Sequence, residues 1–92
     1  MALDWVSLMY DVYVLQNVSN HDEFYTGYSS DLKQRVRSHN EGQNASTRGR
    51  HWRLVYYEAY LTPQAARDRE RILKHDGRVK RFLMDCIKKH LA

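Results

Sequence analysis

The sequence predicts a small α+β domain, of the broad α/β kind, in which helices pack against a three-stranded antiparallel sheet. Runs rich in β-branched and aromatic residues alternate with segments of helical periodicity, and a polar turn joins the first two runs. A chain of 92 residues has room for one core. We therefore expect a single domain over residues 1–92, with its core at about 10–90 and the element order β-β-α-β-α-α.

The first part of the chain predicts a hairpin followed by a helix. Residues 10–16 and 24–28 favour strands because they are rich in β-branched and aromatic residues, and the residues between them are mostly polar. A helix is expected next, from an N-cap at Ser30 to about Glu41, and Gly42 is expected to end it.

Helical spacing on this first helix predicts which side chains approach the sheet. Leu32 and Val36 are four residues apart and mark the buried stripe. Arg35 and His39 flank that stripe, so we expect both near the sheet rather than in solvent. A simpler interpretation of Arg35 is a stem that covers apolar surface while its head reaches water.

The second part of the chain predicts one strand and two helices. Residues 52–60 favour a strand, and Thr62 is the expected cap of a helix over 63–75 that begins with the only proline. A last helix is expected over about 78–91. Its apolar stripe is predicted to comprise Val79, Phe82, Leu83, Cys86, Ile87 and His90. The basic residues Lys80, Arg81, Lys88 and Lys89 are expected mostly to face away from that stripe.

Charge is distributed unevenly along the chain. All 15 Lys and Arg residues lie at Lys33 or later, whereas residues 1–32 hold five acidic residues and neither Lys nor Arg. The loop over 41–51 adds Arg48 and Arg50 among glycine and hydroxyl residues, a composition that suits phosphate binding or an ordinary surface loop. The basic region favours a polyanionic partner, against the alternative that the charges only solvate helix faces.

Several classes of protein are disfavoured by composition. Cys86 is the only cysteine, so no intrachain disulfide is expected. No apolar run approaches the roughly 20 residues of a membrane span, and the N-terminal residues lack a signal-peptide pattern. We expect a cytoplasmic protein without a membrane association. Residues 1–9 are compatible with a tail, a strand extension or a contact surface.

Glu70 and the tyrosines are the candidate chemical groups. Glu70 lies beside Ala66 and Leu73, so its carboxylate needs an ion partner or a metal. The nearby cations that could pair with it are Arg67, Arg71 and Lys74. Tyr13 and Tyr25 suit half-buried strands, and a tyrosine can also accept a proton where neighbouring cations lower its pKa from about 10.

These residues resemble the signature of the GIY-YIG nucleases. Val12-Tyr13, a polar loop and then Tyr25-Thr26-Gly27 resemble the paired tripeptides that name the family. The resemblance covers about residues 10–89 and is greatest to small single-domain members. Its ordered set comprises Tyr13, Tyr25, Gly27, Arg35, His39 and Glu70. Asp11 departs from the pattern, because it stands where the first motif has glycine.

The resemblance implies a metal-dependent endonuclease that hydrolyses DNA phosphodiester bonds, in DNA repair or recombination. Glu70 would hold one Mg²⁺ or Mn²⁺ ion, and Arg35 would grip the scissile phosphate. Tyr25 would orient phosphate or water, and the general base stays open between Tyr13 and His39. The candidate nucleic-acid contacts are Gly27, Arg48, Arg50 and Lys74.

The expected partner is DNA, with RNA left open, and no small-molecule cofactor is expected. A protein partner or a homodimer is also left open. No recognition helix is evident, so we expect readout of shape or backbone rather than of base sequence. Two alternatives differ in class. One is a nucleic-acid-binding module of the same fold with little or no catalysis, and the other is a protein-interaction domain with solvated basic helices.

Overall fold

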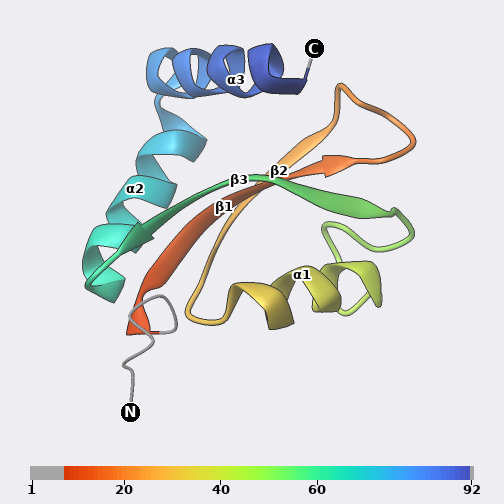
Figure 1. Ribbon diagram of the computed structural model, residues 1–92, viewed down its shortest axis with the longest axis horizontal. Coiled ribbons are helices and arrows are strands. Elements are labelled where there is room, and N and C mark those ends of the chain that lie inside the picture. Colours follow the sequence, from red (N-terminus) through yellow and green to blue (C-terminus); the bar gives the residue numbers. More distant parts are fainter. Residues whose placement is uncertain (1–7, 92) are drawn as a thin grey trace.

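The computed structural model describes residues 8–91, which form three strands and three helices (Figure 1). The elements are β1 (Tyr10–Asn17), β2 (Phe24–Ser29), α1 (Leu32–Asn40), β3 (Trp52–Tyr60), α2 (Pro63–His75) and α3 (Gly77–Leu91). The predicted α+β class and element order are confirmed. The roles suggested for the N-terminal segment concern residues 1–7 above all, which lie outside the described residues.

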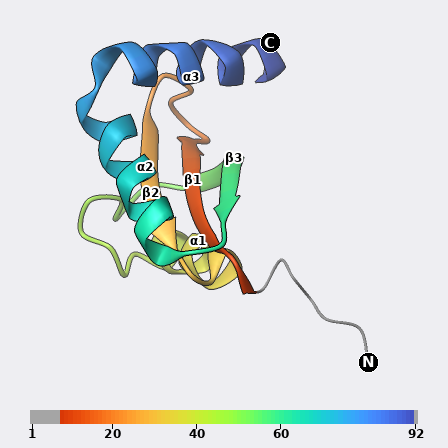
Figure 2. The same ribbon diagram turned by 90° about the vertical axis from the view of Figure 1, so that its left-hand side faces the viewer.

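The sheet is antiparallel and has the order β2-β1-β3, so the predicted hairpin is confirmed and β1 is the central strand. Helix α1 lies on one face of the sheet, while α2 and α3 lie on the other (Figures 1 and 2). Every residue from Asp11 to Asn17 is buried, because β1 is flanked by two strands and covered on both faces. Strand residues alternate between faces, so β1 supplies side chains to two separate cores.

The two cores differ in composition. The face that packs against α2 and α3 is aliphatic, with the buried residues Val12, Val14, Ala66, Leu73, Leu83 and Ile87. The face toward α1 is mainly aromatic, and its buried hydrophobic residues are Tyr13, Leu15 and Trp52. Leu32 and Val36 of α1 pack against this second cluster, as the helical spacing predicted.

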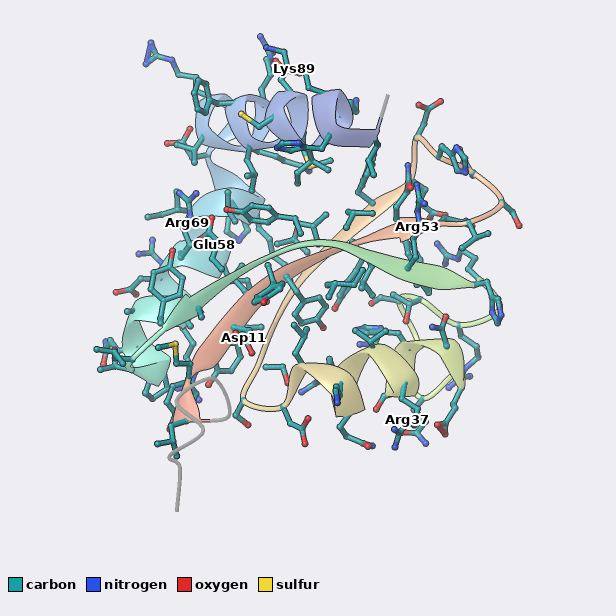
Figure 3. The ribbon with its side chains drawn as sticks, viewed as in Figure 1. Asp11, Arg37, Arg53, Glu58, Arg69 and Lys89 are labelled. Atoms are coloured by element: carbon teal, nitrogen blue, oxygen red, sulfur yellow. The ribbon has the colours of Figure 1, made fainter. Side chains whose placement is uncertain are left out.

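An ionic network ties α2 to β3 at the edge of the aliphatic core. The guanidinium of Arg69 donates to Glu58 at 2.9 Å, and the two side chains point toward one another between the helix and the strand (Figure 3). The hydroxyls of Tyr56 and Tyr60 also donate to this carboxylate. Burial would raise the pKa of Glu58, but the hydrogen bonds from Arg69 and the two tyrosines lower it below its usual value.

A β-bulge in β3 changes which residues face α1. Tyr56 pairs with Val14, but Leu54 pairs with Leu15, so Val55 is the extra residue. Strict alternation from Tyr56 would place Trp52 on the face toward α2. The bulge reverses this, and Trp52 lies in the cluster that faces α1.

The helix ends show local capping. Asp31, and not the predicted Ser30, is the N-cap of α1, and its carboxylate accepts from the backbone N–H of Gln34 at 3.2 Å. The prediction was wrong by one residue because Ser29 Oγ accepts from the Asp31 N–H and holds the preceding turn. Thr62 is confirmed as the cap of α2, where it accepts from Ala65 N–H at 3.2 Å.

Asp76 both ends α2 and starts α3. Its N–H donates to the carbonyl of Ile72, and its carboxylate accepts from the N–H groups of Arg78 and Val79 at 3.0 and 3.2 Å. For this reason α3 begins at Gly77, one residue before the predicted start. None of the helices in the described part of the chain is long and apolar enough to cross a membrane.

The apolar stripe of α3 is narrower than predicted. Leu83 and Ile87 are buried, but Phe82 is 75% exposed, and Cys86 is exposed as well. His90, which the predicted stripe also included, is exposed. The helix crosses one end of the sheet (Figure 1), and the α3 residues that meet the core are Val79, Leu83, Met84 and Ile87. Lys89 points away from the sheet, as expected (Figure 3).

Candidate active site

The candidate site gathers the sequence-predicted residues at the β2 edge of the sheet. Tyr13 and Tyr25 come from neighbouring strands and face α1, and their ring centroids are 6.5 Å apart. His39 comes from the last turn of α1, and its ring centroid lies 5.9 Å from Tyr13 and 4.9 Å from Tyr25. The structure therefore brings together three side chains that are up to 26 positions apart in sequence.

Gly27 makes room for Tyr13. The two residues are direct neighbours across the β1–β2 ladder. A Cβ atom at Gly27 would lie 2.3 Å from the Tyr13 hydroxyl oxygen and 2.4 Å from its Cζ atom. Only glycine lets the tyrosine ring lie across β2, because any side chain there would overlap the phenol. The motif tyrosine and the motif glycine are thus two halves of one steric arrangement.

A buried hydrogen-bond chain runs from the sheet through α1 to the following loop. The Tyr13 hydroxyl lies 2.8 Å from His39 Nε2, and His39 Nδ1 lies 2.7 Å from Thr47 Oγ1. All three residues are at most 1% exposed. Buried polar groups are stable when each one has a hydrogen-bond partner, and all three side chains of this hydrogen-bond chain have such a partner.

The direction of the hydrogen bonds favours one histidine tautomer. The Thr47 hydroxyl donates to the carbonyl of Asn44, so its oxygen is free to accept from His39 Nδ1–H. His39 Nε2 then carries the lone pair and accepts from the Tyr13 hydroxyl. This arrangement makes His39 the proton acceptor of the pair and Tyr13 the donor.

Burial sets the charge state of both groups. Burial, and then the charge of Arg35, lowers the pKa of His39, so the imidazole is neutral at pH 7. Burial raises the pKa of Tyr13, as does Tyr25, and Arg35 opposes the rise only in part. The phenol is therefore neutral in the described structure, and a nearby cation alone does not make it acidic.

Thr47 and Trp52 support the histidine, and neither role was apparent from sequence. Trp52 Nε1–H donates to the carbonyl of Thr47 at 3.0 Å. The Asn40 side chain accepts from the Trp52 N–H at 2.7 Å and donates to the Trp52 carbonyl at 3.0 Å. These bonds fix the loop that positions Thr47. The only signal in the sequence was a hydroxyl residue in a polar loop, which does not distinguish it from its neighbours.

Arg35 lies on the same helix as His39 but is exposed. The expectation that it would lie near the sheet rather than in solvent is therefore wrong for Arg35 and right for His39, which is 0% exposed. The charge of Arg35 nevertheless acts on both members of the pair, because it lowers the pKa of His39 and opposes the rise for Tyr13. An exposed guanidinium beside the buried pair is free to meet an incoming anion.

Glu70 lies on α2 at the same edge of the sheet. Its side chain is 24% exposed, and of the three cations proposed from sequence Lys74 pairs with it, with Nζ 3.5 Å from Oε2. The same ammonium lies 5.6 Å from the ring centroid of Tyr25. The negative charge of Glu70 also raises the pKa of Tyr13, which places the carboxylate within electrostatic reach of the buried pair.

The residues present fit a magnesium ion bound through one carboxylate. Residues 8–91 contain no group of three or more His, Cys, Asp or Glu side chains that could enclose a metal. Mg²⁺ commonly takes one or two carboxylates and completes its shell with water and phosphate oxygens. Glu70 matches that requirement, because among residues 8–91 its partly exposed carboxylate is engaged only by the long contact with Lys74.

The arginines of the loop over 41–51 have structural partners. Arg48 Nε donates to the carbonyl of Gly42 at 3.0 Å. Arg50 pairs with Glu23, donates to the carbonyl of Ser46 at 3.1 Å and lies 5.6 Å from the Trp52 ring centroid. These contacts hold the loop to the β1–β2 turn, and they leave phosphate binding by Arg48 and Arg50 as a prediction.

Asp11, the departure from the family pattern, is a buried carboxylate on the face toward α1. It is 6% exposed, and its Oδ1 atom has no hydrogen-bond partner among the described residues. Figure 3 shows it between the sheet and the start of α1. Burial raises the pKa of Asp11. The position lacks the glycine of the motif, yet the strand continues through it without interruption.

Comparison with known proteins places this arrangement in a family. The family model described as the GIY-YIG catalytic domain matches residues 9–82. The chain is 42% identical over 72 residues to UPF0213 protein HQ_3675A of Haloquadratum walsbyi, covering 76% of this chain and 79% of that protein. It is 37% identical over 65 residues to UPF0213 protein CPE1444 of Clostridium perfringens, covering 68% of each.

A solved structure agrees with both the sequence and the fold. The solution NMR structure of UPF0213 protein BH0048 from Bacillus halodurans is 33% identical and superposes with a TM-score of 0.52, covering 87% of this chain and 85% of that one. The family match and the fold together indicate a small α+β domain of the nuclease class. The chain belongs to the GIY-YIG family, whose domain is an endonuclease-type hydrolase that acts on nucleic acid.

Proposed function

We propose that this protein is a divalent-metal-dependent endonuclease that hydrolyses DNA phosphodiester bonds and serves DNA repair or recombination in the cytoplasm. The observation that carries the proposal is the buried chain from Tyr13 through His39 to Thr47, with contacts of 2.8 and 2.7 Å. Core packing alone does not require a neutral histidine that accepts from a tyrosine at the edge of an anion-accessible site. Proton transfer requires such a neutral histidine as the acceptor.

Tyr13 and His39 act as one proton-accepting unit. The raised pKa of Tyr13 makes a free phenolate unfavourable, so the phenol must release its proton as it takes one from the attacking water. His39 Nε2 already accepts from the phenol and is neutral, so it receives that proton directly. Thr47 holds the imidazole in the orientation that this transfer needs. Tyr13 would therefore take the proton from water, and His39 would take the proton that Tyr13 releases.

The surrounding side chains bind and orient the phosphate. Arg35 is exposed beside the pair and would neutralise charge that builds on the phosphoryl oxygens in the transition state. Tyr25, with the Lys74 ammonium above its ring, would orient the phosphate or the water. Glu70 would hold the divalent cation, which supplies Lewis-acid polarisation of the phosphate and stabilises the leaving oxygen.

The proposal is tested by cleavage of labelled DNAs with Mg²⁺, Mn²⁺ or EDTA. Glu70→Gln keeps the shape of the side chain but removes its charge, and we expect it to abolish metal-dependent cleavage. The matched control is Asp68→Asn on the same helix, where the carboxylate is 57% exposed. A second matched pair is Arg35→Ala and Arg37→Ala, because Arg37 points away from the sheet (Figure 3).

Either of two results would overturn the proposal. Cleavage by Glu70→Gln at the wild-type rate would show that Glu70 does not hold the metal. Binding of DNA by the folded wild-type protein, with no cleavage of duplex, single-stranded or branched DNA in either metal, would favour a nucleic-acid-binding module. Thermal denaturation of each variant separates loss of chemistry from loss of fold.

A further inference from the structure

A basic groove continues from the candidate active site along the outer edge of the sheet. It lies between β2, α2 and α3 and has a volume of about 430 Å³. Tyr25 and Lys74 line it and also belong to the candidate site. The groove therefore adjoins the candidate site, and a strand bound in the groove could continue into that site.

Three lysines from two helices line the groove. Lys74 comes from α2, and Lys80 and Lys88 come from α3. Lys80 and Lys88 are eight residues apart, which is about 12 Å along a helix axis. All three are exposed. Among ion pairs formed by residues 8–91, only the one between Lys74 and Glu70 involves a lysine of the groove.

Two of these lysines lie over aromatic rings. The Lys88 ammonium lies 5.9 Å from the ring centroid of Phe24, and the Lys74 ammonium lies 5.6 Å from that of Tyr25. Phe24 and Tyr25 are adjacent on the edge strand and both are partly buried. Grooves that combine lysines with rings suited to base stacking are typical of single-strand binding. One acid, Asp22, also lines the groove and lies in the turn before β2.

The volume of the groove suits part of a single strand better than a whole double helix. A volume of about 430 Å³ lies near the lower end for small-molecule sites, which span roughly 300–1,000 Å³. A nucleotide fits such a space, whereas a duplex, whose major groove alone is about 12 Å wide, is too large to enter it as a unit. Leu83 and Ile87 hold α3, which forms one wall of the groove, against the core.

We propose that this groove binds a single-stranded DNA segment that continues from the scissile phosphate. The preferred substrate is then a duplex with a single-stranded tail or branch, and not a blunt duplex. This inference rests on the proposed function of the adjoining site. Lys80 and Lys88 contact phosphates of the tail, and Phe24 offers a ring for one base.

The test measures binding in EDTA, so that its result does not depend on cleavage. Fluorescence anisotropy would compare a blunt duplex with the same duplex carrying a 3′ or a 5′ single-stranded tail. The Lys80→Gln/Lys88→Gln variant should lose the affinity that the tail adds and keep that for the blunt duplex. The slope of log affinity against log salt on tailed DNA should fall by about 1.4, since each phosphate contact on a single strand contributes about 0.7.

The matched control is Lys33→Gln/Lys89→Gln, which removes the same charge. Lys89 is on α3 but points away from the sheet (Figure 3), and neither of these residues lines the groove. This control should bind tailed and blunt DNA as the wild type does. Phe24→Leu retains an apolar side chain against the core and should weaken tail binding about tenfold.

Two outcomes overturn the inference. One is equal affinity of the wild type for tailed and blunt DNA. The other is an equal loss in the groove variant and its control, which would mean that net charge alone drives binding. If cleavage fails on every DNA but the tail preference and its sensitivity to Lys80→Gln/Lys88→Gln remain, the proposed function falls and the groove stands. If tailed and blunt DNA are cut alike and the groove variant matches wild type, the inference about the groove falls and the proposed function stands.

Discussion

The two faces of the sheet share one strand but are built on different chemistry. On β1, Val12 and Val14 turn toward α2 and α3 and join an aliphatic core. Tyr13, between them, turns toward α1 and enters a buried hydrogen-bond chain with His39. Residues adjacent in sequence thus serve packing on one face and proton chemistry on the other.

The difference teaches where each face is sensitive. An aliphatic core tolerates other apolar side chains of similar volume, so damage there appears as lost stability. In a buried polar chain, the loss of one group leaves the next without a partner. Substitutions in the buried hydrogen-bond chain should therefore alter chemistry out of proportion to their effect on stability, and those in the aliphatic core should do the opposite.

The largest expected effect is on turnover. Tyr13→Phe keeps the ring and removes the hydroxyl that bonds to His39, and we expect cleavage to slow by about 10²–10⁴-fold, the range for loss of a general acid or base. Single-turnover cleavage and DNA affinity are the measurements, and affinity should be unchanged. A variant that cuts at the wild-type rate would show that the hydroxyl serves only packing.

The corresponding change on the other face is Ile87→Ala. Ile87 is 2% exposed and lies in the aliphatic core, so its truncation should reduce the free energy of unfolding by about 2–5 kcal/mol. Turnover of the folded fraction should remain near wild type. Urea denaturation measures the first quantity, and Ile87→Val, with a loss of about 0.5–1.5 kcal/mol, gives a folded protein for the second. A large loss of turnover in Ile87→Val would break the comparison.

Gly27→Ala should reduce both turnover and stability. The new methyl group would lie 2.3 Å from the Tyr13 hydroxyl oxygen, so the buried ring would have to shift. We expect a loss of about 1–3 kcal/mol in the free energy of unfolding and turnover close to that of Tyr13→Phe. Gly77→Ala is the control, because nothing lies within 4 Å of a Cβ atom there. Wild-type turnover in Gly27→Ala would mean that the position of Tyr13 is not critical.

Thr47→Val tests the last member of the hydrogen-bond chain that runs from Tyr13 through His39. The variant preserves shape but leaves His39 Nδ1–H without its acceptor, which should cost about 1–3 kcal/mol of stability. The wild-type rate should hold below pH 6.5 before it falls, because the pKa of His39 is lowered and the imidazole stays neutral there. The acid limb should shift in Thr47→Val. A pH–rate profile identical to that of the wild type would restrict Thr47 to a structural role.

The smallest expected effect is an increase in stability. Asp11 has a raised pKa, so between its unfolded and folded pKa values the unfolded chain has released a proton that the native state retains. Native stability therefore falls as pH rises through this range and stays reduced at pH 7. Asp11→Asn should stabilise the protein by about 1 kcal/mol at pH 7 and have little effect near pH 3. Equal denaturation midpoints at pH 7 would show that the carboxylate has a partner in solution.

Much of the fold followed from local patterns. The strand over Trp52–Tyr60 and the capped helix over Pro63–His75 were predicted with their bounds, because β-branched and aromatic runs and a Thr-Pro cap act over a few residues. The exposure of Phe82 was not predicted, since periodicity shows which residues share a face but not how much of it another element covers.

The sequence by itself determined the order of the elements, the alternation that separates Tyr13 from Val12 and Val14, and the family signature. These depend on spacing along the chain. The tertiary structure alone decided that Thr47 supports His39, that a bulge at Val55 turns Trp52 toward α1, and that Lys74 pairs with Glu70. These contacts join distant segments or choose among several equivalent neighbours, and only packing of the whole chain selects between them.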